Sequence, residues 1–277
     1  MDIFEEQRLI RFADIDQSDT ITAAAVCDFF QEAAISHAEL LGVGRNAMQK
    51  AGQVWILSRL SVFIERRSRY REQVMVRSWP RGSNRLFAVR DYDIRPPAGP
   101  TPGEPDVFVR GRSAWLILDM EKRRPLRPQA VAETLPPNEG INALPGPGGS
   151  NEAAPALESR DFSGPDARTF FRRAAYSDID YNGHMNNTRY IQWIQDLMEP
   201  EILEEARQIR LDINYLSEVR RGENIALRIL SLDSLAAAGF CPEQNPVPCK
   251  AAFAIEGLRE TAGTEPVSVF RAELHTG

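Results

Sequence analysis

The sequence has no apolar run long enough to cross a membrane and no apolar segment of the kind found in signal peptides. A spanning helix needs about 18 consecutive apolar residues, and no stretch of this chain approaches that length. Near the start, Asp2, Glu5, Glu6, Arg8 and Arg11 interrupt the apolar residues. We therefore expect a cytoplasmic protein that neither spans nor binds membranes.

Cysteine is scarce. The 277 residues include three, Cys27, Cys241 and Cys249, with no CxxC spacing among them. Disulfide frameworks use even numbers of cysteines, and zinc sites use closely spaced ligands. We expect reduced thiols, no bound metal and no cofactor.

A surplus of positive charge is also missing. Lysine and arginine number 33 against 39 acidic residues, which gives a formal net charge of −6. Nucleic-acid-binding proteins usually carry excess positive charge that neutralises phosphates. The balance excludes a general nucleic-acid-binding role, although local arginine clusters can still contact an acidic partner.

Residues 125–160 are rich in Pro, Gly, Ala and small polar residues and show no sustained apolar period. Such a composition is typical of a linker. We therefore predict an N-terminal domain over residues 1–124, a linker over 125–160 and a C-terminal domain over 161–277.

Each predicted domain begins with a similar segment. Residues 11–34, RFADIDQSDTITAAAVCDFFQEAA, align without gaps on residues 175–198, AYSDIDYNGHMNNTRYIQWIQDLM. An apolar helical period follows in both, with a stop at Gly42 in the first and Pro200 in the second. About four strand-like runs come after each helix. We predict an α+β fold in which an antiparallel sheet wraps around a long central helix, formed twice.

Residues 178–200, DIDYNGHMNNTRYIQWIQDLMEP, resemble the second-half signature of the acyl-acyl-carrier-protein thioesterases. Residues 55–94 are similar to the arginine-rich, valine-rich and Arg-Asp strands of that family. The resemblance covers nearly the whole chain apart from the linker. It implies two tandem hotdog domains and hydrolysis of fatty acyl thioesters that ends chain elongation, with acyl carrier protein as partner. Plant members carry a transit segment that is not seen here, so a bacterial-type protein is implied.

The resemblance also assigns the catalytic residues. It places the family's Asp, Asn, His and Glu on Asp180, Asn182, His184 and Glu218. The cysteine that follows this Glu in many plant members is Val219 here. If the resemblance holds, a cysteine nucleophile is not available at that place, and the carboxylates, the amide and the imidazole must do the chemistry.

The residues themselves are compatible with thioester hydrolysis. Positions 180, 182 and 184 alternate, so in an extended chain their side chains would converge. The reaction needs water or a carboxylate as nucleophile and stabilisation of negative charge on the carbonyl oxygen. A helix that begins near Asn186 offers that stabilisation at its N-terminus. We predict that Glu218 or Asp180 attacks or activates water. His184 and Asn182 would orient and stabilise the reacting groups.

Most of these residues also have a purely structural interpretation. Asp178 or Asp180 can cap the turn that follows, and Asn186 and Asn187 are most simply helix-capping groups. Taken alone, Glu218 is a solvated charge at a strand end. His37 lies on the apolar face of the first helix, which indicates a core or interface residue.

The first half lacks the cluster. Its aligned positions are Asp16, Ser18 and Thr20, so hydroxyls replace the amide and the imidazole. We expect one active site per chain, with the first half shaping the acyl pocket. Phe29 and Phe30 would line that pocket or belong to an ordinary core.

Exposed arginines would suit an acidic carrier protein. The candidates are Arg66, Arg67, Arg69 and Arg71 in the first half and Arg220 and Arg221 in the second. Solvated strand ends are the alternative interpretation.

Other functions remain open on the sequence alone. One is an acyl-coenzyme A thioesterase of the same fold, and another is a hotdog protein that binds acyl groups without hydrolysing them. Hotdog dehydratases also use a His and an acid, but they usually have one hotdog per chain. Both a monomer and a homodimer are compatible with the sequence.

Overall fold

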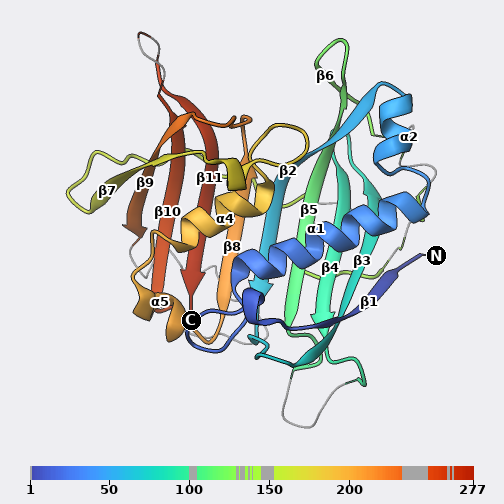
Figure 1. Cartoon of the computed structure of the whole chain (residues 1–277), viewed down its shortest axis with the longest axis horizontal. Helices are drawn as coiled ribbons and strands as arrows, with labels where there is room; N and C mark the ends of the chain where they lie inside the picture. Colours follow the sequence, from blue (N-terminus) through green and yellow to red (C-terminus); the bar gives the residue numbers. More distant parts are fainter. Residues whose placement is uncertain are drawn as a thin grey trace. The chain divides into compact units, whose positions relative to one another are not determined.

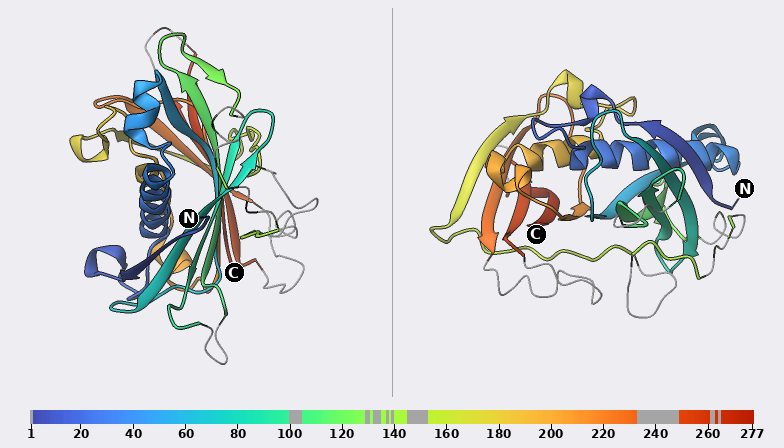
Figure 2. Two further views of the ribbon diagram at one scale, coloured as in Figure 1. Left: turned by 90° about the vertical axis from the view of Figure 1, so that its right-hand side faces the viewer. Right: turned by 90° about the horizontal axis from the view of Figure 1, so that it is seen from below.

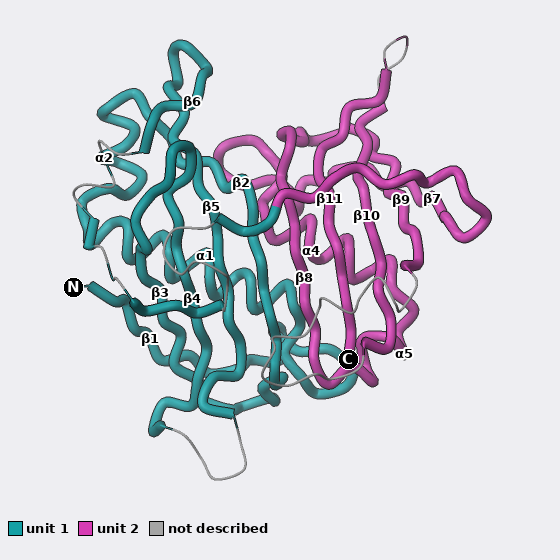
Figure 3. Tube along the Cα trace, turned by 180° about the vertical axis from the view of Figure 1, so that it is seen from behind, with its two compact units in different colours: residues 1–155 teal, residues 156–277 magenta. Residues whose placement is uncertain are grey.

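The computed structural model describes residues 2–99, 105–128, 131, 135–136, 138, 140–144, 153–232, 249–260, 263 and 265–277. These residues belong to two compact units, Met1–Pro155 and Ala156–Gly277, which Figure 3 draws in separate colours. The domain boundaries at residues 124 and 161 stay a prediction.

Unit 1 is an antiparallel sheet with a long helix across one face (Figure 1). The strand order is β1-β3-β4-β5-β2, and a short β6 pairs with β5. The strands are β1 (Phe4–Leu9), β2 (Gln53–Ile64), β3 (Gln73–Ser83), β4 (Ala88–Arg95), β5 (Val109–Asp119) and β6 (Arg124–Leu126). A 3₁₀ turn, η1 (Phe12–Asp14), precedes α1 (Ala23–Leu40), and α2 (Arg45–Lys50) follows it. The left view of Figure 2 shows α1 lying against this sheet.

Helix α1 ends where the sequence predicts. Thr22 caps its start, because its hydroxyl accepts a hydrogen bond from the Ala25 N–H at 3.1 Å. Its end lies just before Gly42, which adopts a left-handed φ of 73°. Phe30 is buried against the sheet and stacks on Tyr92 of β4, with ring centroids 4.6 Å apart. This contact fixes α1 over the middle of the sheet.

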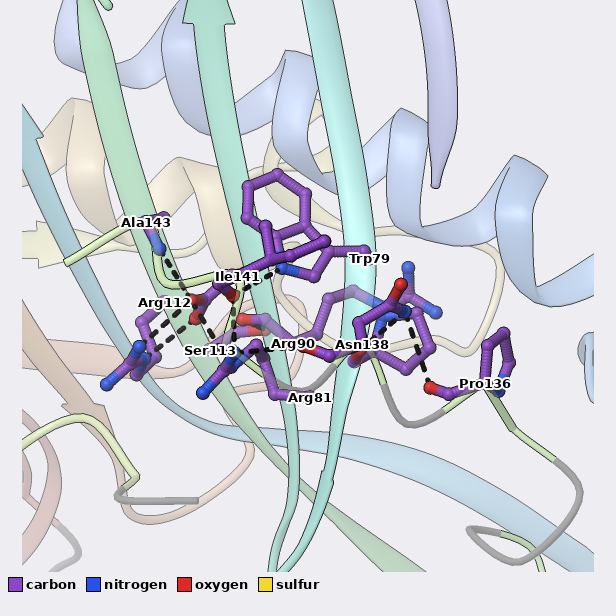
Figure 4. Close-up of polar contacts among 11 residues, drawn as sticks. Trp79, Arg81, Arg90, Arg112, Ser113, Pro136, Asn138, Ile141 and Ala143 are labelled. Carbon is purple, nitrogen blue, oxygen red and sulfur yellow. Dashed lines mark hydrogen bonds and ion pairs between the residues drawn. The ribbon is translucent and has the colours of Figure 1, made fainter. Parts of the chain in front are cut away.

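The opposite face of the unit 1 sheet binds part of the stretch predicted as linker (Figure 4). Trp79 Nε1 donates to the Ile141 carbonyl at 3.1 Å, and the Ala143 N–H donates to Asp91 Oδ2 at 2.9 Å. Asp91 is fully buried and also accepts two hydrogen bonds from Arg112. Because buried charges are stable only when paired, these contacts fasten residues 141–143 to unit 1.

Unit 2 repeats the architecture. Its antiparallel sheet has the order β8-β11-β10-β9-β7. The strands are β7 (Ala167–Arg173), β8 (Ile209–Tyr215), β9 (Asn224–Leu232), β10 (Ala251–Arg259) and β11 (Val267–Thr276). A 3₁₀ turn, η2 (Tyr176–Asp178), precedes α4 (Asn187–Gln195), and α5 (Pro200–Glu204) follows. The helix packs through Tyr190, whose ring meets Phe270 of β11 edge-on at 5.4 Å.

The prediction that the second helix continues to Pro200 was wrong. Helix α4 ends at Gln195, and the next residues form turns in which the Leu197 N–H bonds to the Ile194 carbonyl and the Met198 N–H to the Gln195 carbonyl. These three-residue spacings tighten the chain while keeping both side chains buried. Apolar periodicity therefore persisted beyond the end of the helix.

Candidate active site

The polar cluster of unit 2 lies on a tight turn before α4. Ile179 pairs with Met185 across it, the Asp180 N–H donates to the His184 carbonyl at 2.8 Å, and the Gly183 N–H donates to the Asp180 carbonyl at 3.1 Å. Gly183 has a φ of 80°, which favours glycine there. Local backbone hydrogen bonds therefore close residues 180–184 into a turn, which differs from the extended chain in which alternating side chains would point the same way.

The turn brings His184 to Glu218. His184 Nε2 lies 3.0 Å from Glu218 Oε2, a hydrogen-bonding distance, and the two side chains are 27% and 52% exposed. The two loops are also joined through their backbones: His184 pairs with Arg220, and the Met185 N–H donates to the Val219 carbonyl at 2.7 Å. Two residues distant in the sequence thus form one solvent-accessible pair.

Asp180 and Asn182 are placed differently. Asp180 Oδ1 accepts a hydrogen bond from the Asn182 N–H at 2.8 Å, so this carboxylate caps its own turn. Asn182 is exposed at the tip of the turn. The structure brings both into the same turn as His184, and their catalytic roles stay a prediction.

Helix α4 begins directly after the turn, as predicted. Asn186 Oδ1 accepts a hydrogen bond from the Thr188 N–H at 2.9 Å, and the Asn186 carbonyl accepts one from the Arg189 N–H at 3.0 Å. Within the described part of the chain, the Asn187 N–H donates to no acceptor. The first amide of α4 can therefore bind a developing negative charge.

Unit 1 has the same turn with different side chains. The Asp16 N–H donates to the Thr20 carbonyl at 3.0 Å, and the Asp19 N–H donates to the Asp16 carbonyl at 3.1 Å. Thr20 pairs with Arg69 as His184 pairs with Arg220. The backbone therefore confirms the alignment of Thr20 with His184, and unit 1 has a hydroxyl in place of the imidazole.

An arginine takes the place of the carboxylate in unit 1. Arg67 precedes Arg69 by the same interval at which Glu218 precedes Arg220. Its guanidinium is largely buried, pairs with the Asp16 carboxylate and donates to Ser18 Oγ at 3.2 Å. Unit 1 therefore has neither the histidine nor the glutamate of unit 2 at these positions.

The structure divides the predicted arginine cluster. Arg66 pairs with Glu72 at 2.8 Å, and Arg67 is engaged by Asp16, so neither projects freely into solvent. Arg69 and Arg71 are exposed.

The arginines of unit 2 lie next to the His184–Glu218 pair. Arg220 and Arg221 are both exposed, and the Arg221 guanidinium lies 5.7 Å from the ring centre of Tyr176. These two arginines therefore present exposed positive charge on the loop that carries Glu218.

Three residues of α1 that the sequence analysis singled out are buried. His37 is a core residue, as predicted: it is completely buried, and its Nδ1 lies 3.1 Å from Arg90 Nη1. Phe29 and Phe30 are buried as well.

Two of the three thiols belong to the described residues. Cys27 is buried, which raises the pKa of its thiol, whereas Cys249 is partly exposed. Cys241 lies outside the described residues.

The described residues include no group of His, Cys, Asp and Glu side chains able to hold a metal ion. Among the helices that the structure describes, none is long and apolar enough to cross a membrane.

Sequence reasoning missed Arg259, the last residue of β10. Its Nη1 donates to the Glu218 carbonyl at 2.8 Å. No motif surrounds this arginine, and strand pairing alone brings it to the Glu218 loop.

A helix packed on an antiparallel sheet, formed twice in one chain, with a His–Glu pair beside the second helix, defines a tandem hotdog protein. The family model of the Acyl-ACP thioesterase N-terminal domain matches residues 1–133. The model of the Acyl-ACP thioesterase C-terminal domain matches residues 168–242. The chain belongs to the acyl-ACP thioesterase family.

Curated relatives agree with this assignment. The palmitoyl-acyl carrier protein thioesterase of Cuphea hookeriana is 24% identical over 238 residues, which cover 83% of this chain and 55% of the relative. The protein of the same name from Gossypium hirsutum is 27% identical over 230 residues, covering 79% and 52%. The chain spans about half the length of the curated relatives it matches.

Solved structures confirm the predicted fold class. An acyl-ACP thioesterase from Bacteroides thetaiotaomicron has a TM-score of 0.72 and 21% identity, covering 99% of this chain and 97% of its own. The 12:0-ACP thioesterase from Umbellularia californica has a TM-score of 0.73 and 20% identity, covering 98% and 96%.

Proposed function

We propose that this protein hydrolyses fatty acyl thioesters of acyl carrier protein, releases the free fatty acid and so ends chain elongation. The observation that carries the proposal is the 3.0 Å contact between His184 Nε2 and Glu218 Oε2 beside the start of α4. Membership of the acyl-ACP thioesterase family supports the substrate class.

Glu218 is the better candidate for the base. Its carboxylate is half exposed and can reach a water molecule while it contacts His184. The Asp180 carboxylate is instead engaged by the backbone of its own turn. A base must lie within hydrogen-bonding reach of the proton it removes, and this favours Glu218.

The Asn187 N–H is the proposed donor to the carbonyl oxygen. It opens α4, where the helix dipole favours negative charge, and no acceptor among the described residues occupies it. One such donor to a tetrahedral intermediate contributes roughly 100-fold or more to turnover in other acyl-transfer enzymes.

The reaction follows from these positions. Glu218, paired with His184, takes a proton from water, and the water oxygen bonds to the thioester carbon. The carbonyl oxygen gains negative charge beside the Asn187 N–H. When the C–S bond breaks, the sulfur leaves with its electron pair and receives the proton from the His184–Glu218 pair. The products are the fatty acid and the carrier thiol.

Asp180 and Asn182 complete the proposed catalytic set. Asp180 holds the turn that presents His184, through the hydrogen bond from its own N–H to the His184 carbonyl. Asn182, exposed on the same turn, is proposed to orient the attacking water or the thioester.

The proposed partner is an acidic carrier protein, met by exposed arginines. Arg220 and Arg221 follow Glu218 directly, so a carrier bound there would deliver its thioester to the pair. Curated relatives are named chloroplastic proteins, and for this chain we propose a cytoplasmic location.

A panel of acyl thioesters tests the proposal. The purified protein is incubated with matched acyl chains on acyl carrier protein and on coenzyme A, and thiol release is recorded. Faster release from the carrier protein is expected. Faster release from coenzyme A would show that acyl-coenzyme A, and not the acyl carrier protein thioester, is the preferred substrate. Acyl binding without thiol release would contradict an enzymatic role.

A further inference from the structure

The loop that carries Glu218 joins β8 to β9 and is fastened at its base by β11. The N–H groups of Leu216 and Ser217 donate to the Val269 carbonyl at 2.9 and 3.2 Å. These bonds fix where the loop starts and leave open what directs the Glu218 side chain toward His184.

Arg259 binds this loop at several points. Its Nη1 donates to the Glu218 carbonyl at 2.8 Å and lies 3.4 Å from Glu223 Oε2. Glu223 Oε2 in turn accepts a hydrogen bond from the Arg220 N–H at 2.9 Å. One guanidinium on β10 therefore connects the residue that bears the proposed base to the far side of the loop.

Tyr190 of α4 holds the same peptide group from the other side. Its hydroxyl lies next to the Val219 N–H, and burial raises the pKa of Tyr190, which keeps that hydroxyl neutral. The Glu218 carbonyl and the Val219 N–H belong to one planar peptide unit and point in opposite directions. Arg259 and Tyr190 thus fix the orientation of the unit from which the Glu218 side chain projects.

Unit 1 lacks this arrangement, although its loop has the same backbone. Glu72 Oε2 accepts a hydrogen bond from the Arg69 N–H at 2.9 Å, just as Glu223 does from Arg220. Its ionic partner, however, is Arg66 of the same loop, at 2.8 Å. The loop of the unit without the His–Glu pair is therefore closed without a strand arginine.

The counterparts of both clamping residues are also different. Arg95, the last residue of β4, turns to Asp93, whose Oδ2 lies 2.6 Å from Arg95 Nη2. Val26, which has no hydroxyl, occupies in α1 the place that Tyr190 has in α4. The two contacts occur in the unit that has the His–Glu pair and not in its duplicate.

We propose that Arg259 and Tyr190 are positioning residues, which clamp the Glu218–Val219 peptide so that the Glu218 carboxylate is held against His184. This inference rests on the proposed function of the His184–Glu218 pair. Misplacing a reacting group by about 1 Å can lower turnover roughly 100-fold, so a backbone clamp of this kind matters for rate.

Arg259→Met and Tyr190→Phe test the clamp. Each should lower kcat roughly 10- to 100-fold and leave KM for the acyl carrier protein substrate within about threefold, because the clamp acts on the reacting groups and not on the docking surface. Arg259→Lys keeps a donor and should recover part of the lost kcat. The matched control, Arg95→Met at the end of β4 in unit 1, should retain kcat.

A second readout does not depend on turnover. The chain has three histidines, so the ring nitrogen signals of His184 can be assigned in ¹⁵N-labelled protein by comparison with His184→Ala. In Arg259→Met and Tyr190→Phe these signals should move in the direction seen in Glu218→Gln. If Arg259→Met does not fold, Tyr190→Phe, which removes a single oxygen atom, carries both measurements.

The outcomes separate the two proposals. If His184→Ala and Glu218→Gln abolish turnover while both clamp variants keep wild-type kcat and His184 signals, the clamp is wrong and the proposed function stands. If His184→Ala and Glu218→Gln hydrolyse normally, the catalytic role proposed for the His184–Glu218 pair is wrong. The clamp is then decided by the ring signals, and unchanged signals in both clamp variants would overturn it.

Discussion

Arg67 and Asp16 form an ion pair in unit 1 at the position where unit 2 has Glu218 and Asp180. The Arg67 side chain is only 6% exposed, and its guanidinium also donates a hydrogen bond to Ser18 Oγ. The two turns share their backbone hydrogen bonds and differ in chemistry. A duplicated scaffold has thus kept its turn while an internal ion pair replaces the His–Glu contact.

Arg67→Met should destabilise unit 1. Removing Arg67 leaves the partly buried Asp16 carboxylate without its charge partner, at a cost of about 1 to 3 kcal/mol in the free energy of unfolding. The control is Arg168→Met, whose pair with Glu199 is exposed on both sides and should contribute less than about 1 kcal/mol. Urea unfolding measures both variants, and equal losses would contradict a structural role for the Arg67 pair.

His184→Ala and Asn182→Ala should each lower turnover roughly 100-fold or more with the fold intact, since both are proposed to orient or stabilise the reacting groups. Thr20→Ala, at the position of His184 in unit 1, is the matched control and should keep its activity. Initial rates of thiol release measure this difference, with circular dichroism as the check on folding. Near-normal turnover of both unit 2 variants would rule out the assignment.

Removing the thiols should leave hydrolysis substantially active. Burial disfavours the thiolate of Cys27, and Val219 stands where a nucleophilic cysteine would follow Glu218. The test is the triple variant Cys27→Ala, Cys241→Ser and Cys249→Ser, assayed alongside the wild type before and after iodoacetamide. Loss of activity in a folded triple variant would restore a thiol mechanism.

Stability should depend on Glu273 in acid. Contacts with His275 and with Arg160 outweigh burial and lower the pKa of Glu273 from 4.5 to about 2. The resulting stabilisation, up to about 3 kcal/mol, is complete above pH 4.5 and is lost as the pH falls toward 2.

Glu273→Gln tests this pH dependence. The variant should be less stable than the wild type at pH 7, and the difference should shrink between pH 4.5 and 2. Urea unfolding at several pH values measures it, with exposed Glu201→Gln as the control. A difference that stays constant with pH would exclude this role.

Charge reversal should distinguish carrier protein from coenzyme A. Arg220→Glu with Arg221→Glu, and separately Arg69→Glu with Arg71→Glu, should lower kcat/KM more for the carrier-bound chain than for the same chain on coenzyme A. Higher salt should reduce the effect, since exposed charges are screened beyond about 10 Å at 0.1 M. Because coenzyme A is anionic too, the measured quantity is the ratio of the two efficiencies. A ratio that does not move would place the docking surface elsewhere.

The sequence by itself determined the repeated architecture. Apolar periods, the helix start near Asn186 and the stop near Gly42 are local signals, and they predicted both helices and the α+β class. The repeated Asp-Ile-Asp located the two turns and showed that the first lacks a histidine. Periodicity overextended α4 toward Pro200, because buried side chains can continue their spacing through turns that are no longer helical.

Tertiary structure decided the geometry of the site. Alternation would bring positions 180, 182 and 184 together only in an extended chain, whereas hydrogen bonds within the turn send Asn182 to an exposed tip and His184 to the returning arm. The contacts of Glu218 with His184 and of Arg259 with the Glu218 carbonyl join residues far apart in the chain. Such contacts depend on strand order and register, which arise from packing the whole sheet against its helix and leave no local pattern in the sequence.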